Sequence, residues 1–389
     1  MRSRRGSTGR AMDELDIDAL LTECRVLVCC GSGGVGKTTT SAALALLAAT
    51  HGRSTLVITI DPAKRLAQAM GLNDLSHEPQ RIDLAPIGRS GRLSAMMLDT
   101  KRTFDALIDK YAPNETVKET IFANAYYQHL SSSLMGSREF MAMEKVYEIA
   151  SAAEFDLVIV DTPPSQHALD FLDAPRRLFE LFEGSFVGML LQPYRIAGRL
   201  GFDLFRRSSD RLLKVFEKLT GYEVLADLSD FFLAFSGMFD GFKERSRRVG
   251  EILRRPDTRF LLVCAPEPTS LGEVDRFFAR LAAEGLPVGG LVVNRVHQPP
   301  GPSDVHPDAL DNTDRARLAS IQDDRIEGRP LVERVMQSHH DHTTLATADA
   351  RAIAGTMVAH HSASVTVPHF NRDLHSLADL AAFAASLDA

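Results

Sequence analysis

Short, strongly apolar segments alternate with helical ones along most of the chain. The apolar segments are rich in Val, Ile and Leu, as strands buried on both faces of a parallel sheet usually are. They lie at 25–30, 55–60, 156–161, 259–264, 289–293 and 365–367. Because strands and helices alternate, the pattern predicts an α/β fold, with a doubly wound, mostly parallel sheet covered by helices on both faces.

One long segment interrupts this alternation and predicts several helices in succession. Its clearest helical stretch is 223–254, where Leu and Phe recur at helical spacing. Later in the chain, a stretch rich in Pro, Asp and Gly predicts a loop. The predicted divisions are a flexible N-terminal segment at 1–22, an α/β domain at 23–175 and 259–389, an α-helical insertion subdomain at 176–258 and a mobile loop at 297–318.

Composition narrows the classes of protein that fit this pattern. The 389 residues carry a formal net charge of -7, which argues against a nucleic-acid-binding protein. The four cysteines, Cys24, Cys29, Cys30 and Cys264, form no Cys-x-x-Cys pair, so a reducing, cytoplasmic location is expected. The arginines of the first ten residues precede no apolar segment and do not resemble a secretory signal. Peripheral contact with an anionic membrane through them stays open.

A glycine-rich sequence follows the first predicted strand and precedes a helical run. Residues 31–38 read Gly-Ser-Gly-Gly-Val-Gly-Lys-Thr, the G-x-x-x-x-G-K-[ST] spacing of a phosphate-binding P-loop. Its backbone N–H groups would surround phosphate oxygens, Lys37 would reach the β- and γ-phosphates, and the Thr38 hydroxyl would ligate Mg²⁺. The predicted cofactors are therefore ATP and Mg²⁺. The predicted nucleotide-binding residues are Gly33, Gly34, Val35, Gly36, Lys37, Thr38 and Thr39.

Three more polar residues directly follow predicted strands. Because the carboxyl ends of parallel strands meet at one edge of a sheet, they are expected beside the P-loop. Asp161 would hold Mg²⁺ together with Thr38. Asp61 would orient or activate the water that attacks the γ-phosphate, or else cap a helix beginning at Pro62. Asn294 would bond the adenine edge, or else form a turn.

Together these motifs resemble the ArsA-type ATPases, which include the arsenite-pump ATPase and the ATPase that targets tail-anchored membrane proteins. The resemblance runs from about Arg25 to Leu387. Residues 61–63 are similar to the family's first switch and 161–167 to its second. The resemblance implies a dimeric ATPase in which Lys37 and Asp61 are catalytic and Asn294 contacts adenine. It also implies that Glu267 reaches the nucleotide across the dimer interface.

The chain departs from this family at the P-loop. Ser32 stands where the family has a second lysine that crosses the dimer interface, and Lys64 and Arg65 replace a His-Asn pair. A homodimer is therefore expected to hydrolyse ATP slowly, because Ser32 supplies no cation. Either a paralogous partner donates the lysine in a heterodimer, or Lys64 or Arg65 substitutes for it.

The resemblance also raises the question of a ligand besides nucleotide. The family's paired metal-binding cysteines and arsenite-binding thiols have no counterpart, so no arsenite site is evident. The apolar insertion either forms a groove for an apolar or membrane-protein client or packs its own core, the second being favoured. A late group, His339, His340, His342, His360 and His361, predicts a solvated loop in preference to a metal site.

Two functions remain open at this stage. The first is a Mg²⁺-dependent, dimeric ATPase that couples nucleotide state to a conformational change and possibly to a client. The second is a nucleotide-binding subunit of a hetero-oligomer, with weak ATPase activity of its own, that completes or regulates a paralogous partner. The replacement of lysine by Ser32 is the feature that favours the second.

Overall fold

A computed structural model describes most of the chain, and every structural statement below refers to that part. The described residues are 14–61, 64–124, 127, 137–163, 231, 238–300, 311–313, 316–317, 331–360 and 363–388. Residues 1–13 of the predicted flexible segment, most of the insertion and most of the predicted mobile loop lie outside them. Residues 17–22 of the predicted flexible segment instead form most of helix α1, whose Ile17, Leu20 and Leu21 are buried.

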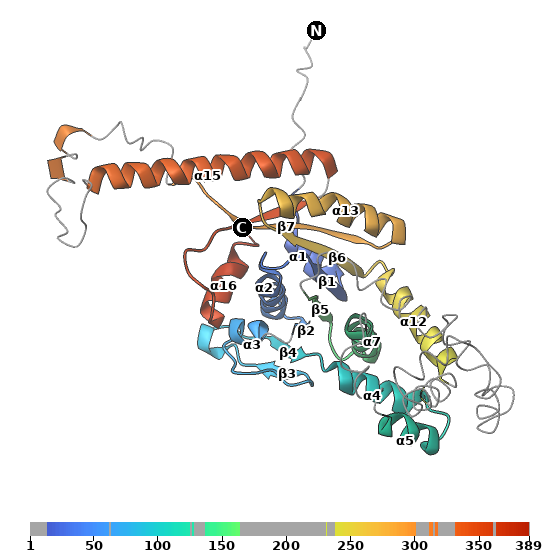
Figure 1. Ribbon diagram of the computed structural model, residues 1–389. Coiled ribbons are helices and arrows are strands. Elements are labelled where there is room, and N and C mark those ends of the chain that lie inside the picture. Colours follow the sequence, from blue (N-terminus) through green and yellow to red (C-terminus); the bar gives the residue numbers. More distant parts are fainter. Residues whose placement is uncertain are drawn as a thin grey trace, which may run out of the picture.

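The centre of the fold is one eight-stranded sheet (Figure 1). Its strand order is β3-β4-β2-β5-β1-β6-β7-β8, and every neighbouring pair is parallel except β3 with β4. The predicted α/β fold with a mostly parallel sheet is confirmed. The strands are β1 (Val26–Cys30), β2 (Ser54–Thr59), β3 (Gln80–Ile82), β4 (Arg92–Met97), β5 (Leu157–Asp161), β6 (Thr258–Cys264), β7 (Val288–Val296) and β8 (Ser364–Pro368).

Two strands at one edge of the sheet, β3 and β4, were not predicted. β3 has only three residues, too few for a periodic signal. β4 contains Ser, Ala and two Met, and it lacks the β-branched residues that mark the other strands. β3 is the edge strand and β4 lies between β3 and β2, so the strand conformation of both depends on pairing with neighbouring strands.

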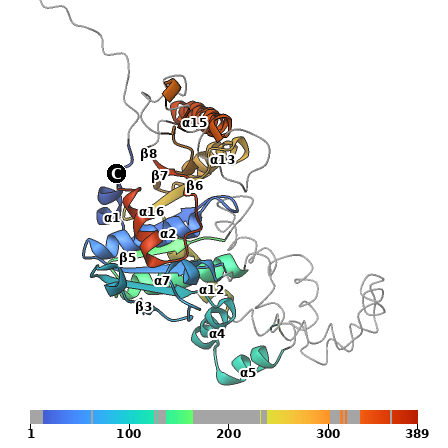
Figure 2. The same ribbon diagram turned by 90° about the vertical axis from the view of Figure 1, so that its left-hand side faces the viewer.

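Helices cover both faces of the sheet (Figures 1 and 2). Successive residues of β1 point to opposite faces, so Leu27 and Cys29 enter one apolar core while Val26, Val28 and Cys30 enter the other. The first core packs against α1 (Ile17–Glu23), α2 (Lys37–Thr50), α3 (Arg65–Ala69) and α16 (Leu377–Ala385). The second packs against α7 (Ser137–Ala152), α12 (Phe239–Leu253), α13 (Pro268–Glu284) and α15 (Leu331–His360).

A third, aromatic cluster joins α7 and α12 to α4 (Thr100–Tyr111), which α5 (Glu115–Ala123) follows in the chain. The short helical turn η1 (Ala85–Ile87) lies elsewhere, against α16. Phe104, Tyr127, Phe140, Phe231 and Phe242 are all buried, with ring centroids of neighbouring pairs 5.7–6.5 Å apart. Beside it, the buried carboxylate of Glu144 on α7 receives the guanidinium of Arg245 on α12, with Nε–Oε distances of 2.6 and 2.7 Å. Large rings and one buried ion pair therefore fasten α12 to α7.

Helices α12 and α15 correspond to two segments discussed from the sequence. Within the predicted helix 223–254, α12 runs from Phe239 to Leu253. The prediction of a solvated loop for the late histidines was wrong in its secondary structure for four of them: His339, His340, His342 and His360 lie on α15, a helix of 30 residues. The side chains of His339, His340 and His342 are half-buried or exposed, and His361 lies outside the described residues. Among the described residues, no helix is long and apolar enough to cross a membrane, and no group of three His, Cys, Asp or Glu could hold a metal ion.

Candidate functional site

The P-loop connects the carboxyl end of β1 to the first turn of α2 and is shaped by two tight glycines. At Gly31 a Cβ would lie 2.1 Å from the carbonyl oxygen of Val263 on β6, so only glycine fits. Gly36 has φ +94° and is the N-cap of α2, and a Cβ there would lie 2.2 Å from the amide nitrogen of Asn294. The loop therefore packs closely against the ends of β6 and β7. The N-terminus of α2 directly follows it.

Lys37 begins α2 and is almost completely buried, although it carries a charge. Its ammonium donates a hydrogen bond to the carbonyl oxygen of Ser32 at 2.6 Å, across the loop. Burial lowers the pKa of Lys37, a change opposed by Asp161 and Asp61 and enhanced by the positive charge of Arg65. A buried ammonium inside a glycine-rich loop is a fitting partner for phosphate oxygens.

Asp161, the last residue of β5, lies between β1 and β2 and is fully buried. One carboxylate oxygen accepts hydrogen bonds from the hydroxyls of Thr38, at 2.8 Å, and Thr59, at 2.9 Å. The other carboxylate oxygen, Oδ1, is buried without a hydrogen-bond partner among the described residues. Burial raises the pKa of Asp161 to about 6, against the lowering effects of Thr38, Thr59 and Lys37.

This donor set fits Mg²⁺. A hard divalent cation prefers carboxylate, hydroxyl and water oxygens, and it usually takes one or two protein ligands and keeps several waters. The Thr38 hydroxyl and the unpaired Oδ1 of Asp161 would hold it, directly or through water, beside the P-loop. The cation would also provide the charge compensation that the buried carboxylate lacks.

Asp61 follows β2 and lies at the rim of the same pocket. Its backbone N–H donates to the Thr59 hydroxyl at 3.2 Å, and its carboxylate lies 3.9 Å from the guanidinium of Arg65. The alternative role of Asp61 as a helix cap is wrong, because α3 begins at Arg65 with Lys64 as its N-cap. The side chain of Asp61 is 15% exposed and lines the pocket.

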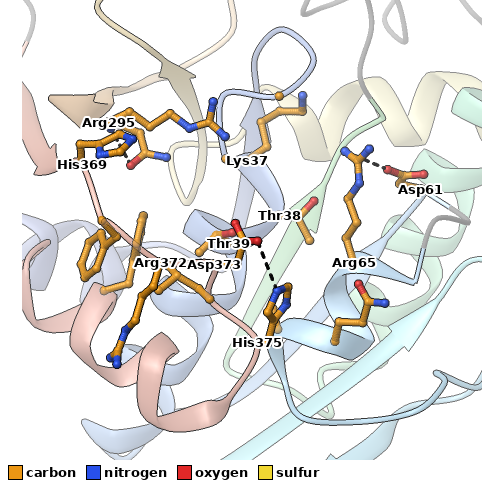
Figure 3. Close-up of a pocket in the computed structure, with 18 of the residues that line it drawn as sticks. Lys37, Thr38, Thr39, Asp61, Arg65, Arg295, His369, Arg372, Asp373 and His375 are labelled. Atoms are coloured by element: carbon orange, nitrogen blue, oxygen red, sulfur yellow. Dashed lines mark hydrogen bonds and ion pairs between the residues drawn. The ribbon is translucent and has the colours of Figure 1, made fainter. Parts of the chain in front are cut away.

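Lys37, Thr38 and Asp61 line one cavity of about 640 Å³, and Asp161 lies buried directly behind Thr38 (Figure 3). Lys37, Thr38 and Thr39 lie between two groups of side chains, with Asp61 and Arg65 on one side and a group from the C-terminal part of the sheet on the other. The lining residues are Gly34, Gly36, Lys37, Thr38, Thr39, Asp61, Arg65, Gln68, Ala69, Thr162, Asn294, Arg295, Pro368, His369, Phe370, Arg372, Asp373, Leu374, His375 and Phe383. The structure thus brings the predicted residues of three strand ends together.

Asn294 lies inside β7 rather than in a turn, and it contacts the P-loop. Its amide donates to the carbonyl oxygen of Val35 at 2.8 Å, and its own carbonyl oxygen accepts from the backbone N–H of Arg295 at 2.9 Å. Arg295 has φ +61°, where the register of β7 with β8 shifts, and its side chain lines the cavity. A contact of Asn294 with adenine stays a prediction, since its amide is engaged by the loop in this structure.

Residues of 368–375 form one side of the cavity, and none of them was predicted as a site residue. His369 directly follows β8, and its ring stacks on that of His297, with centroids 5.2 Å apart and an interplanar angle of 12°. His297 in turn is bonded through Nδ1 and its backbone N–H to the carboxylate of Asp349 on α15, both at 2.8 Å. The position of 365–367 as a parallel strand was the available signal, because its end shares the rim with the P-loop.

Four other residues singled out in the sequence do not line the cavity. Val35 is buried in the core and contributes its carbonyl oxygen to Asn294, while Gly33 is exposed and does not line the cavity. Glu267 is the exposed N-cap of α13 and also lies outside the cavity lining, so its predicted role across a dimer stays a prediction. Ser32 is half-buried and offers Lys37 its backbone carbonyl.

All four cysteines are buried free thiols. Burial raises the pKa of Cys24 to about 11 and the pKa values of Cys29 and Cys264 to about 12, and that of Cys30 is raised as well. These thiols remain protonated at neutral pH and belong to the core rather than to the cavity.

Comparison with known proteins agrees with this site. Residues 24–324 match the anion-transporting ATPase family, whose members are the ArsA ATPases. The ATPase get3 of Neurospora crassa is 30% identical over 276 residues, which cover 70% of this chain and 74% of that protein. The ATPase get3 of Schizosaccharomyces pombe is 28% identical over 270 residues, covering 68% and 71%. The ATPase GET3 of Malassezia globosa is 27% identical over 274 residues, covering 70% and 73%. A P-loop at the rim of a parallel sheet, with carboxylates from two neighbouring strand ends, thus occurs here in a chain that belongs to the anion-transporting (ArsA) ATPase family.

Proposed function

We propose that this chain binds ATP with Mg²⁺ in the 640 Å³ cavity and hydrolyses it to ADP and phosphate. The observation that carries the proposal is Asp161, a buried carboxylate with one unpaired oxygen next to the hydroxyl of the P-loop residue Thr38. A buried carboxylate that its neighbours compensate only in part is costly, and binding of a metal-bound triphosphate would explain why this chain keeps one there.

Four residues at or directly behind the cavity would act in this reaction. Lys37 would exchange the Ser32 carbonyl for phosphate oxygens, and the N-terminus of α2 adds its positive dipole end. Thr38 and Asp161 would hold Mg²⁺, which neutralises phosphate charge when bound. Asp61 would accept a hydrogen bond from the attacking water and orient it. The water oxygen bonds to the γ-phosphorus while the bond to the β–γ bridging oxygen breaks, and a water proton passes to the released phosphate.

The assembly and its client belong to the same proposal. We infer a dimer, either of two identical chains or with a paralogue that supplies a lysine at the position of Ser32, with Glu267 facing the partner's nucleotide. Nucleotide exchange would change the conformation around Asp61 and Asp161 and, through it, the handling of an apolar or membrane-protein client. The family resemblance supports these points and the cytoplasmic location.

The second candidate function is a nucleotide-binding subunit that completes a paralogous partner and hydrolyses ATP weakly on its own. The observation that favours it is the P-loop itself, in which Ser32 contributes only a backbone carbonyl, to Lys37 of its own chain. Such a chain would keep the full nucleotide-binding geometry and lack one cation for catalysis.

The test is phosphate release by the purified chain with ATP, in Mg²⁺ and in excess EDTA, together with nucleotide binding by calorimetry. Lys37→Ala should abolish release and weaken ATP binding, whereas Lys145→Ala, at a half-buried lysine outside the cavity that is paired with Glu148, should change neither. Binding without release, followed by release when a paralogous chain is added, would establish the second function. Absence of both binding and release would refute the proposal.

A further inference from the structure

Basic side chains line the cavity on different sides of the P-loop. Lys37 is buried at its centre, and Arg295 lies on the side of β7 and β8, where Arg372 points away from Lys37 and is paired with Asp379 at 2.7 Å (Figure 3). On the opposite side, where Asp61 lies, the cation that lines the cavity is Arg65. If Asp61 orients the attacking water, Arg65 therefore stands on the side of the transferred γ-phosphoryl group, away from the C-terminal residues.

Two neighbouring basic residues could serve on this side, and their environments differ. The ammonium of Lys64 is bonded to Asp74 at 2.8 Å, both side chains are 57% exposed, and Lys64 does not line the cavity. The guanidinium of Arg65 lies 3.9 Å from the carboxylate of Asp61 and lines the cavity. The charge of Arg65 also acts on Lys37, behind the larger effects of burial and the two aspartates.

Local packing fixes the direction of Arg65. Leu66, Ala67 and Ala69 of α3 are buried in the core beneath α2, which leaves the first residue of this short helix at the cavity. The preceding residue, Lys64, has φ +32°, an uncommon value for a residue with a Cβ, and this turn presents Arg65 to the pocket. Its side chain remains 59% exposed, so the guanidinium has room to move onto a phosphate.

We propose that Arg65 is the cation that stabilises the transferred phosphoryl group, and that the chain which holds the nucleotide supplies it. This inference rests on the proposed ATPase function. As the water oxygen bonds to the γ-phosphorus, negative charge shifts onto the γ-oxygens and onto the bridging oxygen that leaves with ADP. The planar guanidinium donates to two of these oxygens at once, which the single point charge of a lysine does less well. Arg65 thus supplies in cis the charge that Ser32 does not.

The first test separates ground-state binding from transition-state binding. Arg65→Ala should lower kcat about 100- to 1000-fold, while the Kd for Mg²⁺-ATP changes less than about threefold. It should also abolish the tightening of ADP binding by aluminium fluoride, a phosphoryl-transfer analogue, which is measured without turnover. Arg65→Lys should be intermediate, and added guanidinium should partly restore Arg65→Ala. The matched control Lys64→Ala should stay within about twofold of the parent chain.

The second test decides which chain provides the cation. Arg65→Ala is mixed with Lys37→Ala, which keeps Arg65 and lacks the P-loop ammonium. With Arg65 acting in cis, the mixture stays as inactive as its components, and restored turnover would overturn the inference. An Arg65→Ala chain with unchanged kcat and unchanged aluminium fluoride response would also overturn it. An inactive parent chain that binds no nucleotide would instead overturn the proposed function on which it rests.

Discussion

At the scale of single residues, burial of the Asp161 carboxylate costs free energy of folding, and the same carboxylate is the proposed Mg²⁺ ligand. Its carboxylate is fully buried, and its raised pKa of about 6 shows that the hydroxyls of Thr38 and Thr59 and the charge of Lys37 compensate burial incompletely. An unfolded aspartate ionises near pH 4, so the folded state holds this proton more tightly than the unfolded state. Ionisation of Asp161 therefore opposes folding until a cation is bound.

Because its pKa is raised in the folded state, Asp161 should make the protein less stable as pH rises. As pH rises from about 4 to about 6, the unfolded state loses its proton first, and the chain without Mg²⁺ should lose up to about 3 kcal/mol of stability relative to Asp161→Asn. Urea denaturation of both chains in EDTA across this range would measure the difference. Magnesium with ATP should restore the parent chain and leave Asp161→Asn unchanged. A difference that is flat with pH would contradict the raised pKa.

At the scale of elements, the two tight glycines of the P-loop have different roles. Gly36 faces the side-chain amide of Asn294, which can move, whereas Gly31 faces the backbone carbonyl of Val263 on the neighbouring strand β6. The P-loop spacing alone predicts that the loop glycines serve phosphate binding. The structure shows that Gly31 also permits the close packing of the end of β1 against β6.

Gly31→Ala is therefore predicted to damage the fold as well as nucleotide binding. A Cβ 2.1 Å from a backbone oxygen, at φ +150°, should cost roughly 2–4 kcal/mol. The matched control is Gly272→Ala, on the exposed face of α13, where a Cβ meets nothing within 4 Å and should stabilise by about 0.5–1 kcal/mol. Thermal and urea unfolding without nucleotide would measure both, and equal stability of the two variants would refute the packing role.

The sequence predicted much of the sheet because six strands are short, largely apolar runs, most of which are buried along their length. It also placed the P-loop, Asp61, Asp161 and Asn294 at one rim, since parallel strands end together. Strand β4 and the site residues after β8 were not predicted, because their roles depend on contacts with residues that are near in space and distant in the chain. The bond from Asn294 to Val35 and the stacking of His369 on His297 join residues far apart in the chain, and no local pattern reports such contacts.

At the scale of the whole molecule, α7 and α12 attach the aromatic cluster to the sheet. The carboxylate of Glu144 and the guanidinium of Arg245 are buried between these helices, and the guanidinium also lies 3.8 Å from the ring centroid of Tyr147. Breaking a buried pair leaves one charge without compensation, whereas replacing both partners removes the cost of burying either.

Arg245→Met alone is thus expected to destabilise the protein by roughly 3–5 kcal/mol, and the double variant Glu144→Leu with Arg245→Met should recover most of that loss. Urea denaturation of the two single variants and the double variant forms a complete cycle. The surface pair Lys145 and Glu148 on the same helix is the control, with an expected coupling below about 1 kcal/mol. A double variant as unstable as Arg245→Met would show that the pair contributes more than charge compensation.

The bonds that hold the P-loop also bear on the entropy of nucleotide binding. Lys37 already spans the loop to Ser32, and Asn294 already fastens Val35 from β7. The conformational freedom of the loop is therefore restricted during folding, at the expense of the stability of the whole domain, and not at the moment of association. Nucleotide needs only to replace one carbonyl partner of Lys37. Its association should accordingly show the small heat capacity change of binding to a preformed site rather than the large one of a loop that folds around its ligand.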